Sequence, residues 1–123
     1  MKNALGGRGP GALPFSPAYR AGDYVLVSGQ VAFDAEGRLV AGGIEAETRQ
    51  VMQNISAALE LAGCSLTDVV KTTVWLSDRA DFKRFNEVYG SFFPQDPPAR
   101  STVEARLMID AAVEIEAMAY KPV

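Results

Sequence analysis

The sequence contains no histidine, which is the side chain that enzymes use most often for proton transfer near neutral pH. A Ser-His-Asp or Cys-His nucleophile system, and nearly every zinc site, would need it. The single cysteine, Cys64, cannot form an internal disulfide or a multi-thiolate metal site, and we expect it to be a small buried thiol. The sequence therefore predicts neither metal nor cofactor. Any chemistry must come from carboxylates, arginine, hydroxyls and backbone groups.

Long apolar runs and basic clusters are also lacking. The longest apolar runs, such as Val25–Val27 and Val74–Leu76, are too short to span a bilayer. The N-terminus has no apolar stretch of the signal-peptide kind, so we expect a cytoplasmic protein. Twelve basic residues are scattered singly among fifteen acidic ones. This pattern does not favour nucleic-acid binding, although oligomerisation could still assemble a basic patch.

What is present fits one globular domain covering residues 1–123. A length of 123 residues is typical of a single domain, and a composition of 48% hydrophobic and 22% charged residues is ordinary. A chain of this size buries roughly two thirds of the surface of its unfolded state, which is enough for one core.

Hydrophobic periodicity predicts an α+β fold with the element order β-β-α-β-α-β-β. The Gly- and Pro-rich segment 5–17 is expected to be irregular. We expect two helices on one face of a mixed sheet, because each sheet face must pack against something. The predicted strands are 24–33, 38–41, 69–76, 101–107 and 112–120, and the predicted helices are 45–62 and 80–93.

Alternation in the last two strands predicts a polar sheet face. If the helices cover the apolar side of each strand, the polar sets share the opposite face, and Arg100 and Glu114 lie on one surface. Met118 and Tyr120 on that surface suggest an oligomer interface, and most such assemblies are symmetric. Cross-strand ion pairs on a solvated sheet are the alternative, which the pattern alone favours. The predicted polar sets are Arg100, Thr102, Glu104 and Arg106, and Glu114, Glu116, Met118 and Tyr120.

Six segments resemble the RidA/YjgF family of reactive imine deaminases. The combination of SGQ, NxxY, PARS and EIEA is specific, whereas each motif alone is weak. The resemblance implies chorismate-mutase-like subunits in a homotrimer with clefts between neighbours. It also implies hydrolysis of reactive 2-imino or 2-enamino acids, such as 2-aminoacrylate/2-iminopropionate, to 2-keto acids and ammonia. The matching segments are PFSPAYRAGDYVLVSGQ (14–30), ETRQVMQNI (47–55), LAGCSLTDVVKTTVWLSD (61–78), FNEVYGSFF (85–93), PPARSTVEARL (97–107) and VEIEAMAY (113–120).

The same resemblance implies two catalytic roles. Arg100, in PARS, would bind the substrate carboxylate through two parallel hydrogen bonds, a geometry that lysine does not reproduce. Glu114, the first glutamate of EIEA, would activate the attacking water and assist proton transfer from a partly desolvated cleft. The alternative for Arg100 is an ion pair with a neighbouring carboxylate. The alternative for Glu114 is an interface salt bridge.

Five further residues are implied to bind substrate. Thr102 would lie beside the substrate, and Ser28 and Gly29 would line the cleft, where glycine lets the backbone approach a ligand. Phe15 and Tyr89 would form walls of the pocket, although aromatic residues are more often part of the core.

Two departures from the family pattern bear on substrate preference. Phe15 stands where many members have tyrosine, and the stretch 103–107 is one residue shorter than usual, which can reverse side-chain directions unless a bulge compensates. Other possibilities are a trimeric module that binds a small carboxylic acid without catalysis, or a ring-cleavage deaminase of aromatic catabolism. An endoribonuclease is disfavoured by the missing histidines and basic clusters.

Overall fold

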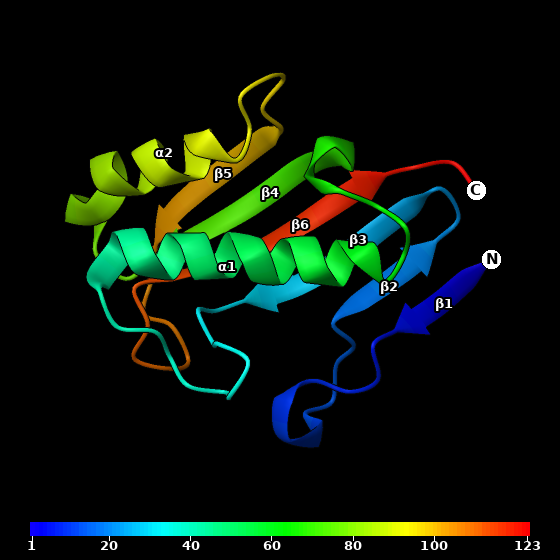
Figure 1. Cartoon of the computed structure of the whole chain (residues 1–123), viewed down its shortest axis with the longest axis horizontal. Coiled ribbons are helices and arrows are strands. Elements are labelled where there is room, and N and C mark those ends of the chain that lie inside the picture. The colour runs from blue at the N-terminus through cyan, green and yellow to red at the C-terminus, as the bar shows by residue number, and fades with distance from the viewer.

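The computed structural model describes residues 1–123 and contains a six-stranded sheet with two helices on one face (Figure 1). The strand order is β1-β2-β3-β6-β4-β5, and every neighbouring pair is antiparallel except β4 and β5. The predicted α+β class, with two helices on one face of a mixed sheet, is confirmed. The elements are β1 (Lys2–Leu5), β2 (Ala18–Ala21), β3 (Tyr24–Gln30), α1 (Gly43–Glu60), β4 (Val69–Leu76), α2 (Phe82–Ser91), β5 (Ala99–Glu104) and β6 (Val113–Tyr120).

Three strands precede α1, where the sequence predicted two. β1 and β2 are too short to show periodicity, and β2 joins β3 through a tight turn in which Gly22 has φ of +59°. The strand predicted at 38–41 is wrong, because only a single bridge between Phe33 and Leu39 forms there. The Asp34 carboxylate accepts the N–H groups of Glu36 and Arg38, which uses this segment in a local turn.

The two helices pack their apolar stripes onto the sheet. In α1, Val51, Met52, Ile55 and Leu59 are fully buried, and Gly63 follows the helix end with φ of +72°. Both helices begin and end within two residues of the predicted bounds, apart from a 3₁₀ turn at Arg79–Asp81 before α2. Neither helix is long and apolar enough to cross a membrane.

The sheet has one covered face and one open face. In β6, Val113, Ile115, Ala117 and Ala119 are buried beneath the helices, so Glu114, Glu116, Met118 and Tyr120 lie on the open face, as predicted. β3 follows the same rule, with Tyr24 and Leu26 exposed. The rings of Tyr24 and Tyr120 meet edge to face at 5.2 Å on the open face. β4, predicted to be buried on both sides, is fully buried only toward the helices.

The side-chain orientation predicted for β5 is wrong. Arg100 and Thr102 stand opposite Thr72 and Val74 of β4, which are buried beneath the helices, so they share the covered side. Val103 instead points to the open face, where its side chain is 49% exposed. β5 is an edge strand at the rim of α2, and a polar side chain can reach solvent there while still facing a helix. Arg100 and Glu114 of one chain therefore lie on opposite faces of the sheet.

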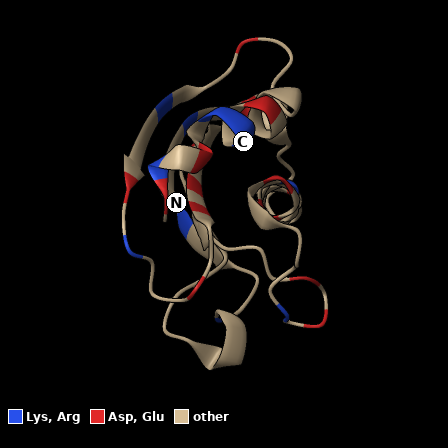
Figure 2. Cartoon of the chain, turned by 90° about the vertical axis from the view of Figure 1, so that its left-hand side faces the viewer, with Lys and Arg blue, Asp and Glu red and all other residues tan.

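Lys and Arg positions occur singly along the ribbon, interspersed with Asp and Glu positions, in the view of Figure 2. The buried Cys64, 4% exposed, confirms the prediction of an internal thiol.

Candidate functional site

The guanidinium of Arg100 lies on an aromatic platform formed by α2. Its central carbon is 4.9 Å from the ring centre of Tyr89, 5.5 Å from that of Phe85 and 5.7 Å from that of Phe82. Stacking of this kind attracts a cation to the face of each ring. Arg100 forms no ion pair and no side-chain hydrogen bond within the chain. All five of its N–H donors are thus available to an external planar acceptor such as a carboxylate.

The platform is itself fixed in the core. Phe85 is fully buried, and the hydroxyls of Tyr89 and Thr72 are hydrogen-bonded at 2.7 Å. Burial raises the pKa of Tyr89. The hydrogen bond to Thr72 and the charge of Arg100 lower this pKa, but by less, so the net shift is upward. The Tyr89 hydroxyl is therefore occupied inside the protein. What this residue offers the site is its ring, beneath the guanidinium.

Thr102 lies two residues after Arg100 on the same face of β5. Its hydroxyl oxygen is the one buried side-chain polar atom of the chain that has no hydrogen-bond partner. The residue lines a cavity of about 580 Å³, together with Phe82 of the platform. Phe82, one of the rings beneath the Arg100 guanidinium, thus borders this cavity, although Arg100 itself does not line it. Its other lining residues are Leu76, Asp78, Arg79, Ala80, Val103 and Glu104.

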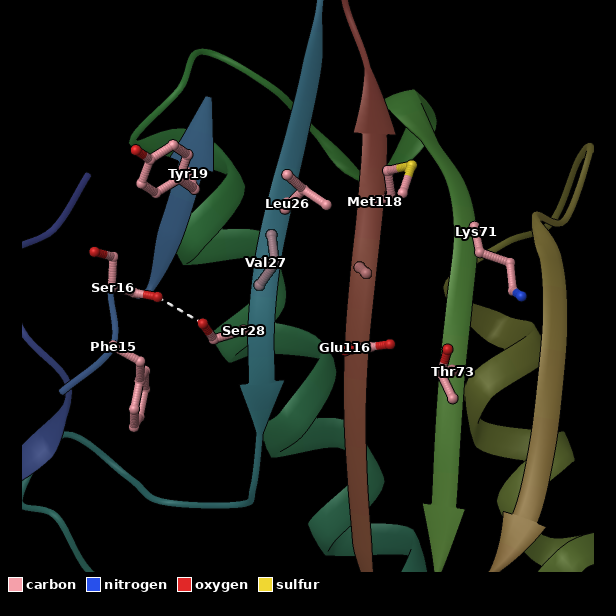
Figure 3. Close-up of a pocket in the computed structure, with 11 residues that line it drawn as sticks. Phe15, Ser16, Tyr19, Leu26, Val27, Ser28, Lys71, Thr73, Glu116 and Met118 are labelled. Atoms are coloured by element: carbon pink, nitrogen blue, oxygen red, sulfur yellow. Dashed lines mark hydrogen bonds between the residues drawn. The ribbon is translucent and has the colours of Figure 1, made fainter. Parts of the chain in front are cut away.

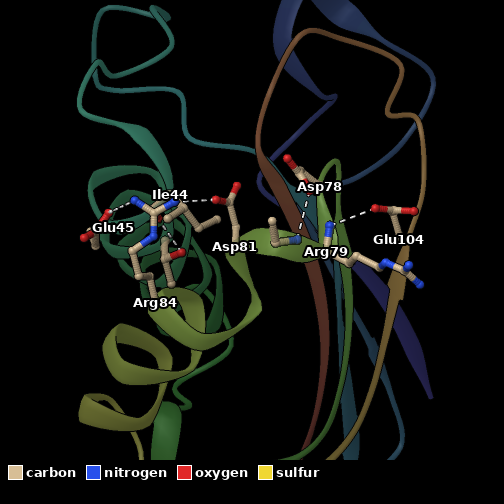
Figure 4. Close-up of polar contacts among 9 residues, drawn as sticks. Ile44, Glu45, Asp78, Arg79, Asp81, Arg84 and Glu104 are labelled. Atoms are coloured by element: carbon tan, nitrogen blue, oxygen red, sulfur yellow. Dashed lines mark hydrogen bonds and ion pairs between the residues drawn. The ribbon is translucent and has the colours of Figure 1, made fainter.

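Backbone capping fixes the connection from β4 to α2 at the rim of this cavity (Figure 4). Asp78 accepts the N–H of Ala80 at 2.9 Å, and Glu104 of β5 accepts the N–H of Arg79 at 2.8 Å. Arg84, on the outside of α2, is 2.7 Å from Asp81 and 3.8 Å from Glu45. Arg84 is therefore engaged by carboxylates, unlike Arg100.

Glu114 occupies the open face of β6 and has no polar partner in the chain. Burial is the main cause that raises the pKa of the Glu114 carboxyl, and repulsion from Glu116 raises it further. Its carboxylate packs directly against Gly29 of β3, because a Cβ built on Gly29 would overlap Oε2 of Glu114. A partly desolvated carboxyl with a raised pKa of this kind suits general acid–base chemistry.

Ser28 anchors the bulge in β3 that carries Gly29. The register of β3 against β6 shifts between Val27 and Gln30. Within this bulge the Ser28 hydroxyl donates to the carbonyl of Ser16 at 2.6 Å, and its N–H donates to the carbonyl of Pro17 at 3.0 Å. Ser28 therefore ties the bulge to the N-terminal segment, and its hydroxyl hydrogen is already used there.

Phe15 and Ser28 line a second cavity, of about 420 Å³, on the open face (Figure 3). The Phe15 ring is 41% exposed and packs over Gly9, where a Cβ would collide with it. Across the cavity lie Lys71 and Thr73 of β4 and Glu116 of β6. The lining mixes polar and apolar side chains, and the remaining lining residues are Ser16, Tyr19, Leu26, Val27, Ala117 and Met118.

The predicted site residues thus fall into two separate groups in one chain. We call Arg100, Thr102 and the α2 platform the anchor half, and Glu114, Gly29, Ser28 and Phe15 the carboxylate half. The first lies on the covered side of the sheet at the β5 edge, and the second lies on the open face. The structure does not bring the two halves together within one chain.

Sequence reasoning missed several residues of both halves. Phe82 and Phe85 stand out in the sequence only as aromatic residues at helical spacing in 80–93, and their place beneath Arg100 becomes apparent only from the side-chain orientation of β5. Glu116 was seen as a polar-face residue, but its effect on Glu114 required the side-chain environment. No group of three or more potential metal-ligating side chains lies close together in the structure.

Comparisons with known proteins point to one family. Residues 8–121 match the family described as Endoribonuclease L-PSP. A RutC family protein of Pyrococcus horikoshii is 49% identical over 110 residues, covering 88% of this chain and 87% of the relative. The human 2-iminobutanoate/2-iminopropanoate deaminase is 41% identical over 117 residues, covering 93% of this chain and 85% of the relative.

Solved structures agree closely with the fold. The crystal structure of yeast Mmf1 superposes with a TM-score of 0.92 at 32% identity, covering 98% of this chain and 99% of the other. The crystal structure of RidA from the Antarctic bacterium Psychrobacter sp. gives a TM-score of 0.88 at 37% identity, covering 96% and 98%.

Proposed function

Because the chain belongs to the RidA/YjgF family, described as Endoribonuclease L-PSP, we propose that it hydrolyses reactive 2-imino and 2-enamino acids to 2-keto acids and ammonia. Human and mouse relatives that are each 41% identical carry the name 2-iminobutanoate/2-iminopropanoate deaminase. The observation that carries the proposal is the unpaired Arg100 guanidinium on its aromatic platform, whose Phe82 ring borders a cavity. A half-buried cation without an anionic partner favours binding of a carboxylate, the group common to all these substrates.

We further propose that the working site forms between chains of a homotrimer. The two halves face opposite ways in one chain, so the anchor half of one subunit must meet the carboxylate half of its neighbour. The open face supplies apolar surface for such an interface, since Tyr24, Leu26 and Tyr120 are each at least 40% exposed. Symmetric assembly repeats the same composite site at every interface.

In the proposed mechanism the substrate carboxylate binds Arg100 and leaves the imine carbon facing Glu114 of the next subunit. The substrate nitrogen enters as the protonated imine, and the Glu114 carboxylate takes a proton from a water molecule whose oxygen bonds to the imine carbon, which gives a neutral amino alcohol. The protonated Glu114 gives this proton to the nitrogen, the carbon–nitrogen bond breaks with release of ammonia, and the Glu114 carboxylate takes the hydroxyl proton as the carbonyl forms. The 2-keto acid leaves, and Glu114 passes the remaining proton to ammonia or solvent, which regenerates the carboxylate.

The demands of this reaction match the limited machinery of the chain. The imine already reacts with water, so orientation, carboxylate anchoring and one acid–base group can supply the rate gain. Ribonuclease activity, which the family description suggests, finds less support, because the twelve basic residues are scattered singly among fifteen acidic ones and histidine is lacking.

The test is a steady-state assay with 2-iminopropionate made in situ by an amino-acid oxidase. The wild type should release 2-keto acid faster than spontaneous hydrolysis, and Arg100→Ala and Glu114→Ala should each lose this acceleration. A different result, in which the wild type binds 2-keto acids through Arg100 but never outpaces spontaneous hydrolysis, would establish a carboxylate-binding module in place of an enzyme.

A further inference from the structure

Gly29 is one of two glycines, with Gly9, whose φ lies outside the left-handed region and at which an added Cβ would overlap a side chain. At Gly9 that side chain is the Phe15 ring, and at Gly29 it is a carboxylate. The backbone conformation at Gly29 suits any residue. A Cβ at this position would nevertheless overlap Oε2 of Glu114 and lie 3.1 Å from its Cδ and 3.4 Å from its Cγ. The space that a side chain would take is filled by the Glu114 carboxylate. The glycine is therefore required by that carboxylate and not by the backbone.

No polar contact holds Glu114 in place within the chain. Its carboxylate accepts no hydrogen bond and forms no ion pair, whereas the buried Glu47 accepts the N–H of Ala112 at 2.9 Å. Packing against the β3 backbone is therefore what determines where the Glu114 carboxylate lies. The bulge that presents Gly29 is in turn fixed by the two hydrogen bonds from Ser28 to the N-terminal segment.

We infer that Gly29 is a positioning residue for Glu114: the missing Cβ forms a seat on β3 that holds the carboxylate against the sheet, facing the composite site. This inference rests on the proposed function, in which Glu114 activates water. It gives Gly29 a role besides close backbone approach to the ligand. The seat also keeps the carboxylate partly out of water, on the side of the sheet where the neighbouring subunit is proposed to dock.

The surroundings of the seat contain few charges. β3 presents only Ser28, Gly29 and Gln30 at this level, and the residue opposite Glu114 on β4 is Trp75. On the open face the charged group beside Glu114 is Glu116, two residues farther along β6. The next charged group is Lys71 of β4, which lies opposite Met118 and four residues from Trp75. In the proposed trimer Arg100 of the neighbouring subunit faces the seat as well. Burial is the larger cause of the raised Glu114 pKa, so displacement from the seat should lower it.

The kinetic test compares Gly29→Ala with Gly90→Ala. Gly90 lies in α2 with open space around its α-carbon and φ outside the left-handed region, so it is a matched control. An added methyl at position 29 should displace the end of the flexible Glu114 side chain and leave the fold intact. We expect kcat of Gly29→Ala to fall about 10- to 100-fold with KM and thermal unfolding little changed. Gly90→Ala should keep the wild-type kcat.

Two comparisons separate positioning from a general structural effect. In the Glu114→Ala background, Gly29→Ala should cause no further loss, because the group that it displaces is absent. The acid limb of the kcat/KM profile of Gly29→Ala should move to lower pH. A wild-type kcat in Gly29→Ala, or the same loss with and without Glu114, would overturn the inference.

A second readout does not depend on activity. Carboxyl NMR of protein labelled with 13C-glutamate follows the titration of Glu114 directly, with Glu114→Gln assigning its signal. We expect Gly29→Ala, and not Gly90→Ala, to lower the pKa of Glu114. If the wild type proved inactive, the proposed function would fail while this titration still decided the inference; an unchanged Glu114 titration in Gly29→Ala would refute it.

Discussion

At the scale of single residues, the account depends on the geometry of one guanidinium. Arg100→Lys keeps the positive charge over the α2 platform but removes the planar pair of donors that matches a carboxylate. Loss of one charge-assisted hydrogen bond, worth about 1.5–3 kcal/mol, should raise KM about 10-fold or more. Steady-state kinetics should show this rise in KM. The control Arg84→Lys, at an exposed ion pair on α2, should leave KM unchanged. Equal kinetics in the two variants would rule out bidentate anchoring.

The second residue-scale prediction concerns pH. The working form of Glu114 is the carboxylate, so activity should rise as pH increases through its raised pKa. Glu116→Gln removes a repulsive negative charge and should lower the pKa of Glu114, which moves the acid limb of kcat/KM to lower pH. The shift should be partial, because burial is the larger cause and remains. Glu60→Gln, an exposed site at the end of α1, should leave the profile in place. If the acid limb of kcat/KM did not move in Glu116→Gln, that result would contradict the assignment of this limb to Glu114.

The sequence supports Arg100 and Glu114 as candidates, but it does not show their surroundings. Their motifs and the lack of histidine point to an arginine and a carboxylate. Arg100 is free of ion pairs, and Glu114 packs against Gly29. Both facts depend on the positions of side chains from distant segments of the chain. Alternation along a strand predicts which residues share a face, but it does not say which face a helix covers.

At the scale of elements, α2 is expected to serve both the core and the site. Phe85 is fully buried, and Phe85→Ala should lower the free energy of unfolding by about 3–5 kcal/mol. Phe82 is 44% exposed, and Phe82→Ala should mainly remove part of the platform under Arg100, raising KM about 2- to 5-fold, as the loss of one exposed cation–π contact implies. Urea unfolding and steady-state kinetics of both variants check the division. Comparable destabilisation by the two substitutions would contradict it.

α1 is tied to the start of β6 by Glu47, whose carboxylate accepts the N–H of Ala112 at 2.9 Å. Burial raises the pKa of Glu47, outweighing its backbone hydrogen bonds. The folded protein then holds this proton more tightly than the unfolded chain does, so the contribution of Glu47 to stability falls as pH rises through the ordinary carboxyl range to the raised value.

Glu47→Gln keeps an acceptor for Ala112 and removes the titration. The free energy of unfolding of Glu47→Gln, relative to that of the wild type, should therefore increase as pH rises through that window. Above the window the difference should stay constant. Urea unfolding at a series of pH values and one fixed protein concentration measures this difference. Parallel stability curves would show that Glu47 has no raised pKa.

Element prediction from the sequence succeeded where periodicity is long and failed at the rim of the sheet. α1, α2, β4 and β6 have clear patterns and were found within a few residues. β1 and β2, with four residues each, are held in place by pairing with β3, which no local pattern reveals. β5 was located, but its side-chain orientation was misjudged because the apolar Val103 faces the open side of an edge strand.

At the scale of the whole molecule, the two halves of the site act together only if chains associate. The polar and apolar open face predicted from β6 is present, and its exposed Leu26 and Tyr120 are suited to an interface. The sequence placed Arg100 and Glu114 on one surface of one chain. Their separation across the sheet makes association a requirement of the proposed chemistry.

Subunit complementation tests this central claim most directly. Arg100→Ala and Glu114→Ala proteins, each inactive alone, are unfolded, mixed in equal amounts and refolded together, and deaminase activity is measured beside each variant refolded alone. If each site takes its arginine and its glutamate from different chains, about one quarter of the interfaces in a random symmetric assembly are intact, and about a quarter of wild-type activity should return. Refolded mixed assemblies without activity, next to an active refolded wild type, would place both residues in one chain and contradict the account.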